Sequence, residues 1–242
     1  MNAICSITFR PTDIYCHFLN SFSNYKVFVV VDDNEFDLSN FIQNYENITF
    51  IQINNELCRN SGYIDLSFTI NKLISGWDKA LYHFGIVDTS FEYIWFMEDD
   101  VFFHNEDTLI QIDNTYTNTD LLSNNYVENV DGDKSTWHWN IININHPPPY
   151  YWAMICIIRL SKNMMNCIHE YATTHKTLFF SEALFPTTAF KNNLSYECPS
   201  VFNNIFYRHD FKKEDITTIG LYHPVKNINH HVEFREHLNI MP

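Results

Sequence analysis

Glycine, basic residues and long apolar runs are all scarce in this chain of 242 residues. It has only five glycines, too few to suggest the glycine-rich loops that cradle triphosphates. Lys and Arg number 15 against 29 Asp and Glu, and the formal charge of −14 argues against nucleic-acid binding. The six cysteines are scattered and include no C-x-x-C pair, which argues against a structural zinc site and a disulfide framework.

Targeting and membrane signals are also missing. No apolar run reaches the roughly 18 residues that suggest a transmembrane helix. The N-terminus has no basic region followed by a long apolar one, so we expect no secretory signal and a cytoplasmic protein. Asn, Ile, Phe and Tyr are abundant, a bias typical of AT-rich genomes such as those of large DNA viruses or protists. For a viral protein the location would be the host cytoplasm.

Apolar residues are plentiful: 45% of the chain is hydrophobic and 17% is aromatic, which indicates a globular fold. Over the first hundred residues, strand patterns alternate with helix patterns. That order predicts a mostly parallel sheet flanked by helices, with right-handed crossovers. Strands are expected at 4–9, 26–31, 48–53 and 93–97, and helices at 13–22 and 70–84.

The second half of the chain is less regular. No internal repeat and no linker divides it from the first half, so we expect one α/β domain of Rossmann type over residues 1–242. Short strands or loops are expected at 119–125 and 136–143, a strong strand at 151–160, helices at 161–175 and 184–193, and late strands at 205–207 and 218–221.

Three consecutive carboxylates, Glu98, Asp99 and Asp100, end the apolar run at 93–97. Apolar residues resume at Val101, and charge placed against a core is costly unless a cation or hydrogen bonds compensate it. Open α/β sheets bind ligands at the carboxyl ends of their strands, and Mg²⁺ and Mn²⁺ prefer carboxylate and phosphate oxygens. The triplet therefore predicts a metal-bridged nucleotide diphosphate; a solvated acidic turn is the alternative.

The order of strands and helices, with Asp32 and Asp33 closing one strand and the acidic triplet 98–100 closing another, resembles a GT-A glycosyltransferase. The resemblance implies a single domain in which residues 1–103 bind a nucleotide sugar and residues 104–242 bind the acceptor. It also implies transfer of a sugar from a nucleotide-diphosphate sugar to a glycan or other hydroxyl acceptor, with Mn²⁺ or Mg²⁺ as cofactor.

The same resemblance implies roles for five residues. Glu98 and Asp100 would hold the metal, Asp99 would contact ribose or metal, and His223 would be a further metal ligand. Glu182, the one acid in an apolar and aromatic run, would accept the acceptor hydroxyl proton, which implies inversion. If Glu182 only stabilises the first turn of a helix, a retaining mechanism stays open.

Donor contacts are expected from five more positions. Thr8 and Arg10 follow the first strand, Asp32 ends the second, and Lys79 lies on the helix before the metal strand. Lys226 stands near the C-terminal end, where it could neutralise a donor phosphate. Each also has an ordinary alternative role, in a turn, a surface ion pair or the solvated face of a helix.

Aromatic residues flank a run of three prolines, and Trp137, Trp139, Tyr151 and Trp152 are the candidates for an acceptor cleft. Aromatic faces stack on sugar rings, which favours this assignment. Packing in an aromatic-rich core is the alternative. Trp77 lies on the apolar face of its expected helix and is assigned to the core.

Three other functions remain as alternatives. A nucleotidyltransferase would need a glycine-rich basic loop after the first strand, which is absent. A metal-dependent phosphodiesterase could use the acidic cluster, although the overall negative charge disfavours nucleic acid as its substrate. A catalytically inactive relative that binds glycans or nucleotide sugars would keep the fold and the aromatic residues without turnover.

Overall fold

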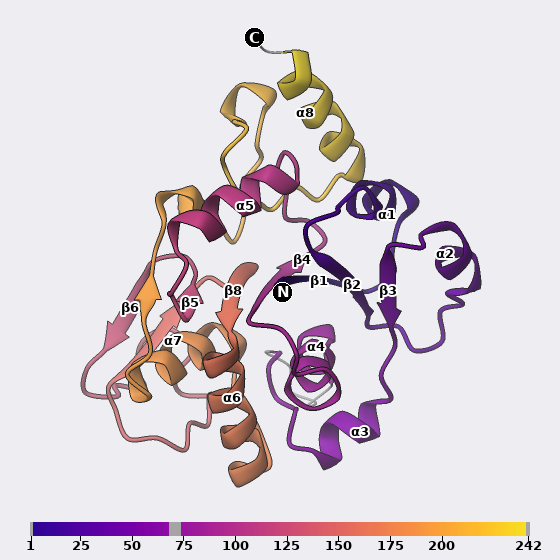
Figure 1. The fold of residues 1–242 in the computed structure, drawn as a ribbon. Coiled ribbons are helices and arrows are strands. Elements are labelled where there is room, and N and C mark those ends of the chain that lie inside the picture. Colours follow the sequence, from indigo (N-terminus) through magenta and orange to yellow (C-terminus); the bar gives the residue numbers. More distant parts are fainter. Residues whose placement is uncertain (1, 68–73, 241–242) are drawn as a thin grey trace.

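A seven-stranded sheet of order β3-β2-β1-β4-β8-β5-β9 forms the centre of the protein (Figure 1). The computed structural model describes residues 2–67 and 74–240. Four of the strands are parallel neighbours: β1 (Asn2–Thr8), β2 (Lys26–Val31), β3 (Ile48–Ile51) and β4 (Tyr93–Glu98). This confirms the expected α/β fold with a mostly parallel central sheet flanked by helices.

Strands from the second half extend the same sheet. β8 (Ile157–Ser161) pairs antiparallel with β4, and it is followed in the sheet by β5 (Leu121–Leu122) and β9 (Tyr196–Glu197). Two small two-stranded sheets lie outside it. They are β6 (Tyr126–Asn129) with β7 (Tyr150–Ala153), and β10 (Asn204–Ile205) with β11 (Tyr222–His223).

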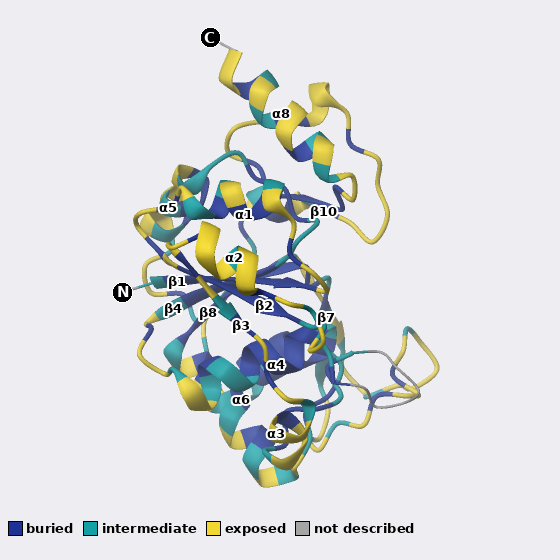
Figure 2. Ribbon diagram, turned by 90° about the vertical axis from the view of Figure 1, so that its right-hand side faces the viewer, coloured by how far each residue is buried: buried dark blue, intermediate teal, exposed yellow. Residues whose placement is uncertain are grey.

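Helices cover both faces of the central sheet (Figure 2). One face carries α1 (Asp13–Asn20), α2 (Ser39–Asn44) and α5 (Glu106–Thr115). The other carries α3 (Asn55–Asn60), α4 (Gly76–Tyr82) with the π-helical turn His83–Val87, α6 (Lys162–His175) and α7 (Ser181–Lys191). α8 (Ile228–Ile240) packs with Phe102 and Tyr222 in a third apolar cluster.

The double cover explains the unbroken apolar run of β2. Side chains alternate between the two faces of a strand, so Val27 and Val29 enter the core beneath α1 and α5, whereas Phe28 and Val30 enter the core beneath α4 and α6. A strand buried on both sides has no polar positions to alternate with. The expected strand at 26–31 is confirmed residue for residue.

Helix starts follow the expected capping chemistry. The Thr12 hydroxyl accepts a hydrogen bond from the Tyr15 amide at the start of α1, as expected for a helix at 13–22. α4 begins at Ser75 with a capping box that includes Asp78. The expectation of a helix over 70–84 is only partly testable, because residues 68–73 lie outside the described residues; the described part is helical from 76 to 87.

Three expectations for the second half are wrong or incomplete. The apolar stretch 151–160 is not one strand, because β7 pairs with β6 whereas β8 pairs with β4, and residues 154–156 carry the chain between the two sheets. The late strand expected at 218–221 lies instead at Tyr222–His223. α5 and α8 were not anticipated. In the ranges 2–67 and 74–240, no helix is both long and apolar enough to cross a membrane.

Candidate functional site

The acidic triplet lies at the carboxyl ends of β1 and β4, two parallel neighbours in the middle of the sheet. Ile7 is in register with Glu98, so Thr8 and Asp99 emerge side by side beyond the strands. The Thr8 hydroxyl donates a hydrogen bond to the Asp99 carboxylate. This contact fixes Asp99 at the edge of the sheet where ligands of open α/β folds bind.

β11 is held against the acidic segment by backbone hydrogen bonds. Phe102 and Tyr222 exchange two of them, at 2.8 and 2.9 Å, and the Val225 amide donates to the Asp100 carbonyl at 2.7 Å. As a result the His223 Nε2 lies 3.2 Å from Asp100 Oδ1 and 3.6 Å from Glu98 Oε2. The structure thus brings together three of the residues selected from the sequence, from segments more than a hundred residues apart.

The orientation of the His223 ring favours a ligand role for its other nitrogen. Nδ1 lies 2.7 Å from the Phe206 carbonyl, a contact that requires a proton on Nδ1 because the carbonyl oxygen only accepts. In the neutral imidazole this leaves the Nε2 lone pair directed at the carboxylates of Glu98 and Asp100. A backbone carbonyl that fixes the tautomer in this way is typical of metal-binding histidines.

Burial and neighbouring charges shift the pKa values of Glu98, Asp99 and His223. Burial and the neighbouring Asp100 carboxylate raise the pKa of Glu98 to about 7, against the opposing effect of a Trp77 hydrogen bond. Burial and Asp100 likewise raise the pKa of Asp99. Burial lowers the pKa of His223, but its contact with Asp100 and the charge of Glu98 outweigh that effect and the pKa is raised. Each group is shifted toward its protonated form, chiefly by burial for the two acids and by the neighbouring carboxylates for His223.

Glu98 and Asp100 each have a carboxylate oxygen within 3.6 Å of His223 Nε2, so each lies where it could share a divalent cation with this imidazole nitrogen. Asp100 Oδ1 is buried and accepts no well-aligned hydrogen bond from any group in the described part of the chain. His223 Nε2, 3.2 Å away, can donate to this oxygen only when the imidazole is protonated, whereas a cation at this point would satisfy it together with Glu98 and a neutral His223.

Trp77 is part of this site, although the sequence assigned it only to the core. The residue is 8% exposed, as expected for a core residue, but its indole Nε1–H donates to Glu98 Oε1 at 3.0 Å. One carboxylate oxygen is therefore held by the indole while the other faces His223. Trp77 lies in the first turn of α4, between Ser75 and Asp78 of the capping box, and from there its indole reaches the end of β4.

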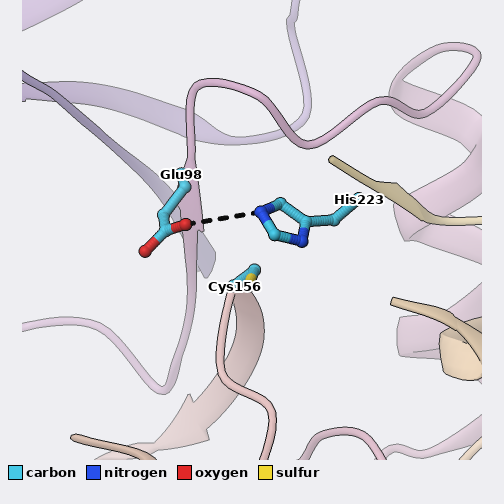
Figure 3. A group of neighbouring side chains, drawn as sticks. All are labelled: Glu98, Cys156 and His223. Carbon is cyan, nitrogen blue, oxygen red and sulfur yellow. Dashed lines mark ion pairs between the residues drawn. The ribbon is translucent and has the colours of Figure 1, made fainter. Parts of the chain in front are cut away.

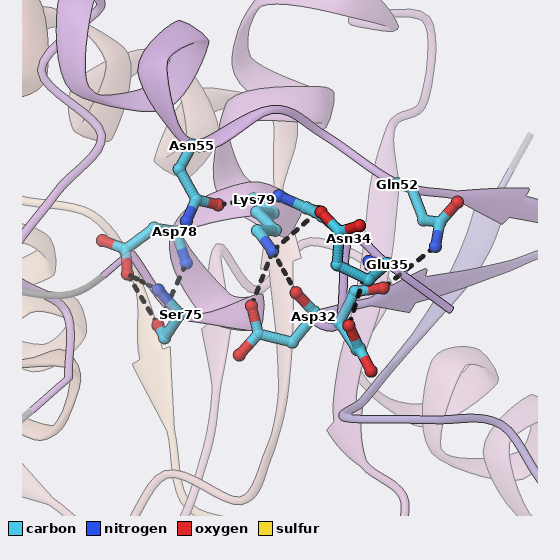
Figure 4. Close-up of polar contacts among 9 residues, drawn as sticks. Asp32, Asn34, Glu35, Gln52, Asn55, Ser75, Asp78 and Lys79 are labelled. Atoms are coloured by element: carbon cyan, nitrogen blue, oxygen red, sulfur yellow. Dashed lines mark hydrogen bonds and ion pairs between the residues drawn. The ribbon is translucent and has the colours of Figure 1, made fainter. Parts of the chain in front are cut away.

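Lys79 and Asp32 are paired with each other (Figure 4). The Lys79 side chain is buried, and its ammonium forms a 2.7 Å ion pair with the Asp32 carboxylate. It also donates to the Asp32 carbonyl and, at 3.1 Å, to Asn34 Oδ1. With three acceptors around it, the ammonium positions the end of β2 and has no surface open to a phosphate.

Arg10 also has a protein partner. Its Nε donates to Asp33 Oδ2 at 2.6 Å, and its guanidinium lies over the rings of Phe9 and Phe36. The Arg10 side chain is 57% exposed, so the guanidinium remains accessible beside the ends of β1 and β2.

Glu182 lies in the first turn of α7 and is half-buried. Burial, with a smaller contribution from the Glu98 charge, raises the pKa of Glu182 to about 7. A pKa near neutrality is suited to a group that accepts a proton during a reaction.

The four acceptor-cleft candidates are divided between two aromatic clusters. Trp137 stacks on Trp152 with ring centroids 4.6 Å apart, and buried Trp139 packs edge-on against Trp137. Tyr151 lies on the opposite face of β7 and stacks on Phe190 at 4.0 Å. The four rings therefore do not form one platform.

The tryptophan cluster continues toward α7 through Phe180, whose ring centroid is 5.8 Å from that of Trp137. Phe180 precedes the first turn that carries Glu182. Phe180 therefore joins the cluster of Trp137 and Trp152 to the start of α7, two residues before Glu182.

Lys226 lines a cavity of about 410 Å³ beside β11. Arg208, His209 and His230 share its wall with one acid, Asp210, so basic side chains outnumber acidic ones there in a chain of strongly negative charge. Neither Arg208 nor Lys226 forms an ion pair with any carboxylate of the described residues. An anionic ligand would find unpaired positive charge at this position.

Trp77, Cys156 and Arg208 were not selected from the sequence as site residues. Trp77 carried a weak signal, since its helix precedes the metal strand. Cys156 carried none, because its approach to Glu98 and His223 depends on the break between β7 and β8 (Figure 3). Arg208 also carried no clear signal, because the basic residues near it in the sequence alternate with acidic ones such as Asp210 and Glu214.

Sequence comparison identifies no relative: no family model and no curated protein matches the chain. Solved structures do match. The galactosyltransferase LgtC in complex with donor and acceptor sugar analogs has a TM-score of 0.53 at 12% identity, covering 100% of this chain and 98% of that one. An active-site mutant of LgtC gives 0.51 at 11% identity, with the same coverage. Mouse xyloside xylosyltransferase 1, in its apo form, gives 0.49 at 7% identity, over 94% and 99% of the two chains. At these identities the likeness to LgtC concerns the fold, and along its whole length the chain has the GT-A fold.

Proposed function

We propose that the protein is a metal-dependent glycosyltransferase that moves a sugar from a nucleotide-diphosphate sugar to a hydroxyl group of a glycan or similar acceptor. The observation that carries the proposal is the convergence of Glu98, Asp100 and His223 at the carboxyl ends of β1 and β4. The GT-A fold shared with LgtC supports it. Within that fold, residues 1–103 would provide most of the donor side and residues 104–242 the acceptor side.

The cation is proposed to be Mn²⁺ or Mg²⁺, held by Glu98, Asp100 and His223. When bound, it would neutralise charge on the diphosphate as the bond between sugar and phosphate oxygen breaks. Lys226 and Arg208 would bind phosphate oxygens from the adjoining cavity. Asp99, held by the Thr8 hydroxyl, would accept a hydrogen bond from a ribose hydroxyl.

Glu182 is proposed as the general base. In the transfer step the acceptor oxygen attacks the anomeric carbon, the leaving diphosphate keeps the electron pair, and Glu182 takes the acceptor proton. Its raised pKa of about 7 supports this role, as does its place in the first turn of α7, two residues after Phe180, which contacts the tryptophan cluster. Attack from the face opposite the diphosphate would invert the configuration of the sugar.

A thermal-shift screen tests the metal and the donor together. Nucleoside diphosphates and nucleotide sugars would be added with Mn²⁺ or with EDTA. A ligand at about 100 times its dissociation constant stabilises the folded state by about 2.7 kcal/mol. For a chain of this size that corresponds to a melting temperature higher by roughly 5–11 °C. We expect such a shift for one nucleotide class, with Mn²⁺ only.

Two variants locate the effect. Asp100→Asn should abolish the Mn²⁺-dependent shift, whereas Asp133→Asn, the same change at an exposed carboxylate, should preserve it. Glu182→Gln should bind the donor normally but release no nucleoside diphosphate in the presence of acceptor. Full turnover by that variant would restrict Glu182 to a structural role and favour retention. No shift with any nucleotide would favour an inactive glycan-binding relative.

A further inference from the structure

Cys156 adds a sulfur atom to the proposed metal group. One donor atom from each of Glu98, Cys156 and His223 lies within 4.8 Å of the other two. Figure 3 shows the three side chains converging from β4, from the segment before β8 and from β11. Neither the acidic triplet nor the comparison with other folds indicated a sulfur ligand here.

The position of Cys156 is fixed by the sheet. Its carbonyl accepts a hydrogen bond of 2.9 Å from the Glu98 amide, which continues the pairing of β4 with β8. The residue is buried, at 6% exposure. The thiol is therefore part of the floor of the site and not a mobile surface group.

Sulfur, imidazole nitrogen and carboxylate oxygen together form a donor set that is typical of zinc. Mg²⁺ requires nearly octahedral oxygen coordination and rarely accepts a thiolate. Zn²⁺ and Co²⁺ accept thiolate, imidazole and carboxylate in four-coordinate sites, and three protein ligands leave a position for a further group. Asp100 Oδ1, 3.2 Å from His223 Nε2, is one candidate for that position.

We propose that Glu98, Cys156 and His223 form a mixed sulfur, nitrogen and oxygen site that binds Zn²⁺ and Co²⁺ through the Cys156 thiolate, and that this thiolate gives the site its preference for these ions over Mg²⁺. On binding, a metal–sulfur bond forms and the thiol proton is released to solvent. The inference rests on the proposed function only in sharing Glu98 and His223 as metal ligands.

Cobalt reports directly on the thiolate, because coordination of Co²⁺ by sulfur produces a ligand-to-metal charge-transfer absorption in the near ultraviolet. Co²⁺ would be titrated into the full chain without nucleotide. We expect the absorption in the wild type and its loss on addition of Zn²⁺. In Cys156→Ser it should be absent, whereas Cys167→Ser, a matched change at a half-buried cysteine on α6, should retain it.

Dissociation constants for Zn²⁺ and Mg²⁺, measured in the wild type and in Cys156→Ser, test the metal selectivity of the site. Loss of a direct ligand should weaken Zn²⁺ binding at least as much as loss of an outer hydrogen-bond partner, which is about 10–100-fold. Mg²⁺ binding should change little in Cys156→Ser. Absorption that persists in that variant, or equal losses for Zn²⁺ and Mg²⁺, would overturn the proposal. If the variant does not fold, X-ray absorption of the wild-type zinc protein decides, since a Zn–S distance of about 2.3 Å is required.

The result can be separated from the transferase proposal. A Mn²⁺-dependent nucleotide shift in a protein that binds Co²⁺ without charge-transfer absorption would refute the sulfur ligand and leave the transferase proposal standing. Charge-transfer absorption in a protein that responds to no nucleotide would support the sulfur ligand and count against the transferase.

Discussion

Trp77→Phe removes one hydrogen bond from Glu98 and preserves an aromatic ring at the start of α4. The indole Nε1–H lies 3.0 Å from Glu98 Oε1 and holds the carboxylate while its other oxygen faces His223. The Trp77 ring packs against Phe96 and Phe185, contacts that a phenylalanine ring can partly maintain. The substitution therefore tests whether an oriented Glu98 is needed for metal binding.

Two independent estimates of the effect agree in size. A hydrogen bond to a charged acceptor contributes about 1.5–3 kcal/mol. Loss of a partner that orients a metal ligand weakens metal binding by about 10–100-fold, or roughly 1.4–2.7 kcal/mol. We therefore expect the dissociation constant for Mn²⁺ to rise by about 10–100-fold in Trp77→Phe.

Free Mn²⁺ can be measured directly by electron paramagnetic resonance, which keeps metal affinity separate from folding stability. Trp95→Phe is the matched control, because Trp95 Nε1 also donates to a carboxylate, Asp113 Oδ1, at 3.1 Å. Trp95 is fully buried on the opposite face of β4 from the core that contains Trp77. The control should lower the free energy of unfolding and leave the Mn²⁺ affinity unchanged.

An unchanged Mn²⁺ affinity in Trp77→Phe would refute the reasoning, since Glu98 would then either need no orientation or not be a ligand. Equal losses of affinity in Trp77→Phe and Trp95→Phe would attribute the effect to general destabilisation. Only a loss confined to Trp77→Phe supports a positioning role for the indole.

Three further predictions concern buried charge away from the metal ligands. Burial raises the pKa of Asp78 to about 7, so the free energy of unfolding should fall by up to roughly 4 kcal/mol as pH rises from about 4 to 7. Denaturant titrations at several pH values should show that Asp78→Asn removes this pH dependence. A pH dependence equal to that of the wild type would refute the prediction. Lys79→Met removes the partner of the Asp32 carboxylate, which is 30% exposed and can be hydrated, so it should lower the free energy of unfolding by about 1.5–3 kcal/mol in chemical denaturation. A loss of nucleotide affinity at unchanged stability would instead make Lys79 a donor contact. Asp113→Ala leaves the buried Arg159 guanidinium without its carboxylate partner and should lower the free energy of unfolding, measured by chemical denaturation, by about 3–5 kcal/mol. A decrease below about 1 kcal/mol would contradict a stabilising buried ion pair.

The first half of the fold could be predicted because its signals are local. The run at 26–31 has the length and composition of a strand buried on both sides, and Thr12 carries the side chain that a helix start needs. The acidic triplet could be recognised for the same reason, because what is unusual about it is that apolar segments flank it directly on both sides. Such features need no knowledge of what packs against them.

The second half depends on pairing that no local pattern reveals. The stretch 151–160 is apolar throughout, yet its two ends pair with different strands, β6 and β4. A continuous apolar run identifies burial, but it contains no mark of where the chain changes from one sheet to another. Tyr222 and His223 form only a two-residue strand, whose pairing with β10 and with Phe102 is likewise set by tertiary structure.

Residues of the candidate site could be predicted only where the local sequence marks them. Glu98 and Asp100 are marked by sequence, and His223 was selected through the family resemblance. Trp77 and Cys156 have no such mark, because an indole and a thiol in apolar surroundings read as core residues. Their contribution depends on where β4 ends relative to α4 and β8.

The two carboxylate centres in this protein differ in how many protein donors surround them. Asp113 is saturated by protein donors: Arg159 at 2.7 Å, Tyr25 at 2.7 Å, and the Trp95 indole and Asn2 amide at 3.1 Å. The acidic group at the end of β4 has few donors for its several acceptor atoms, and the buried Asp100 Oδ1 has no aligned hydrogen bond within the described chain. Folding alone would not favour such a deficit, because uncompensated buried charge lowers stability. Since any cation that binds there also stabilises the folded state, stability should depend on metal at this centre and not at Asp113.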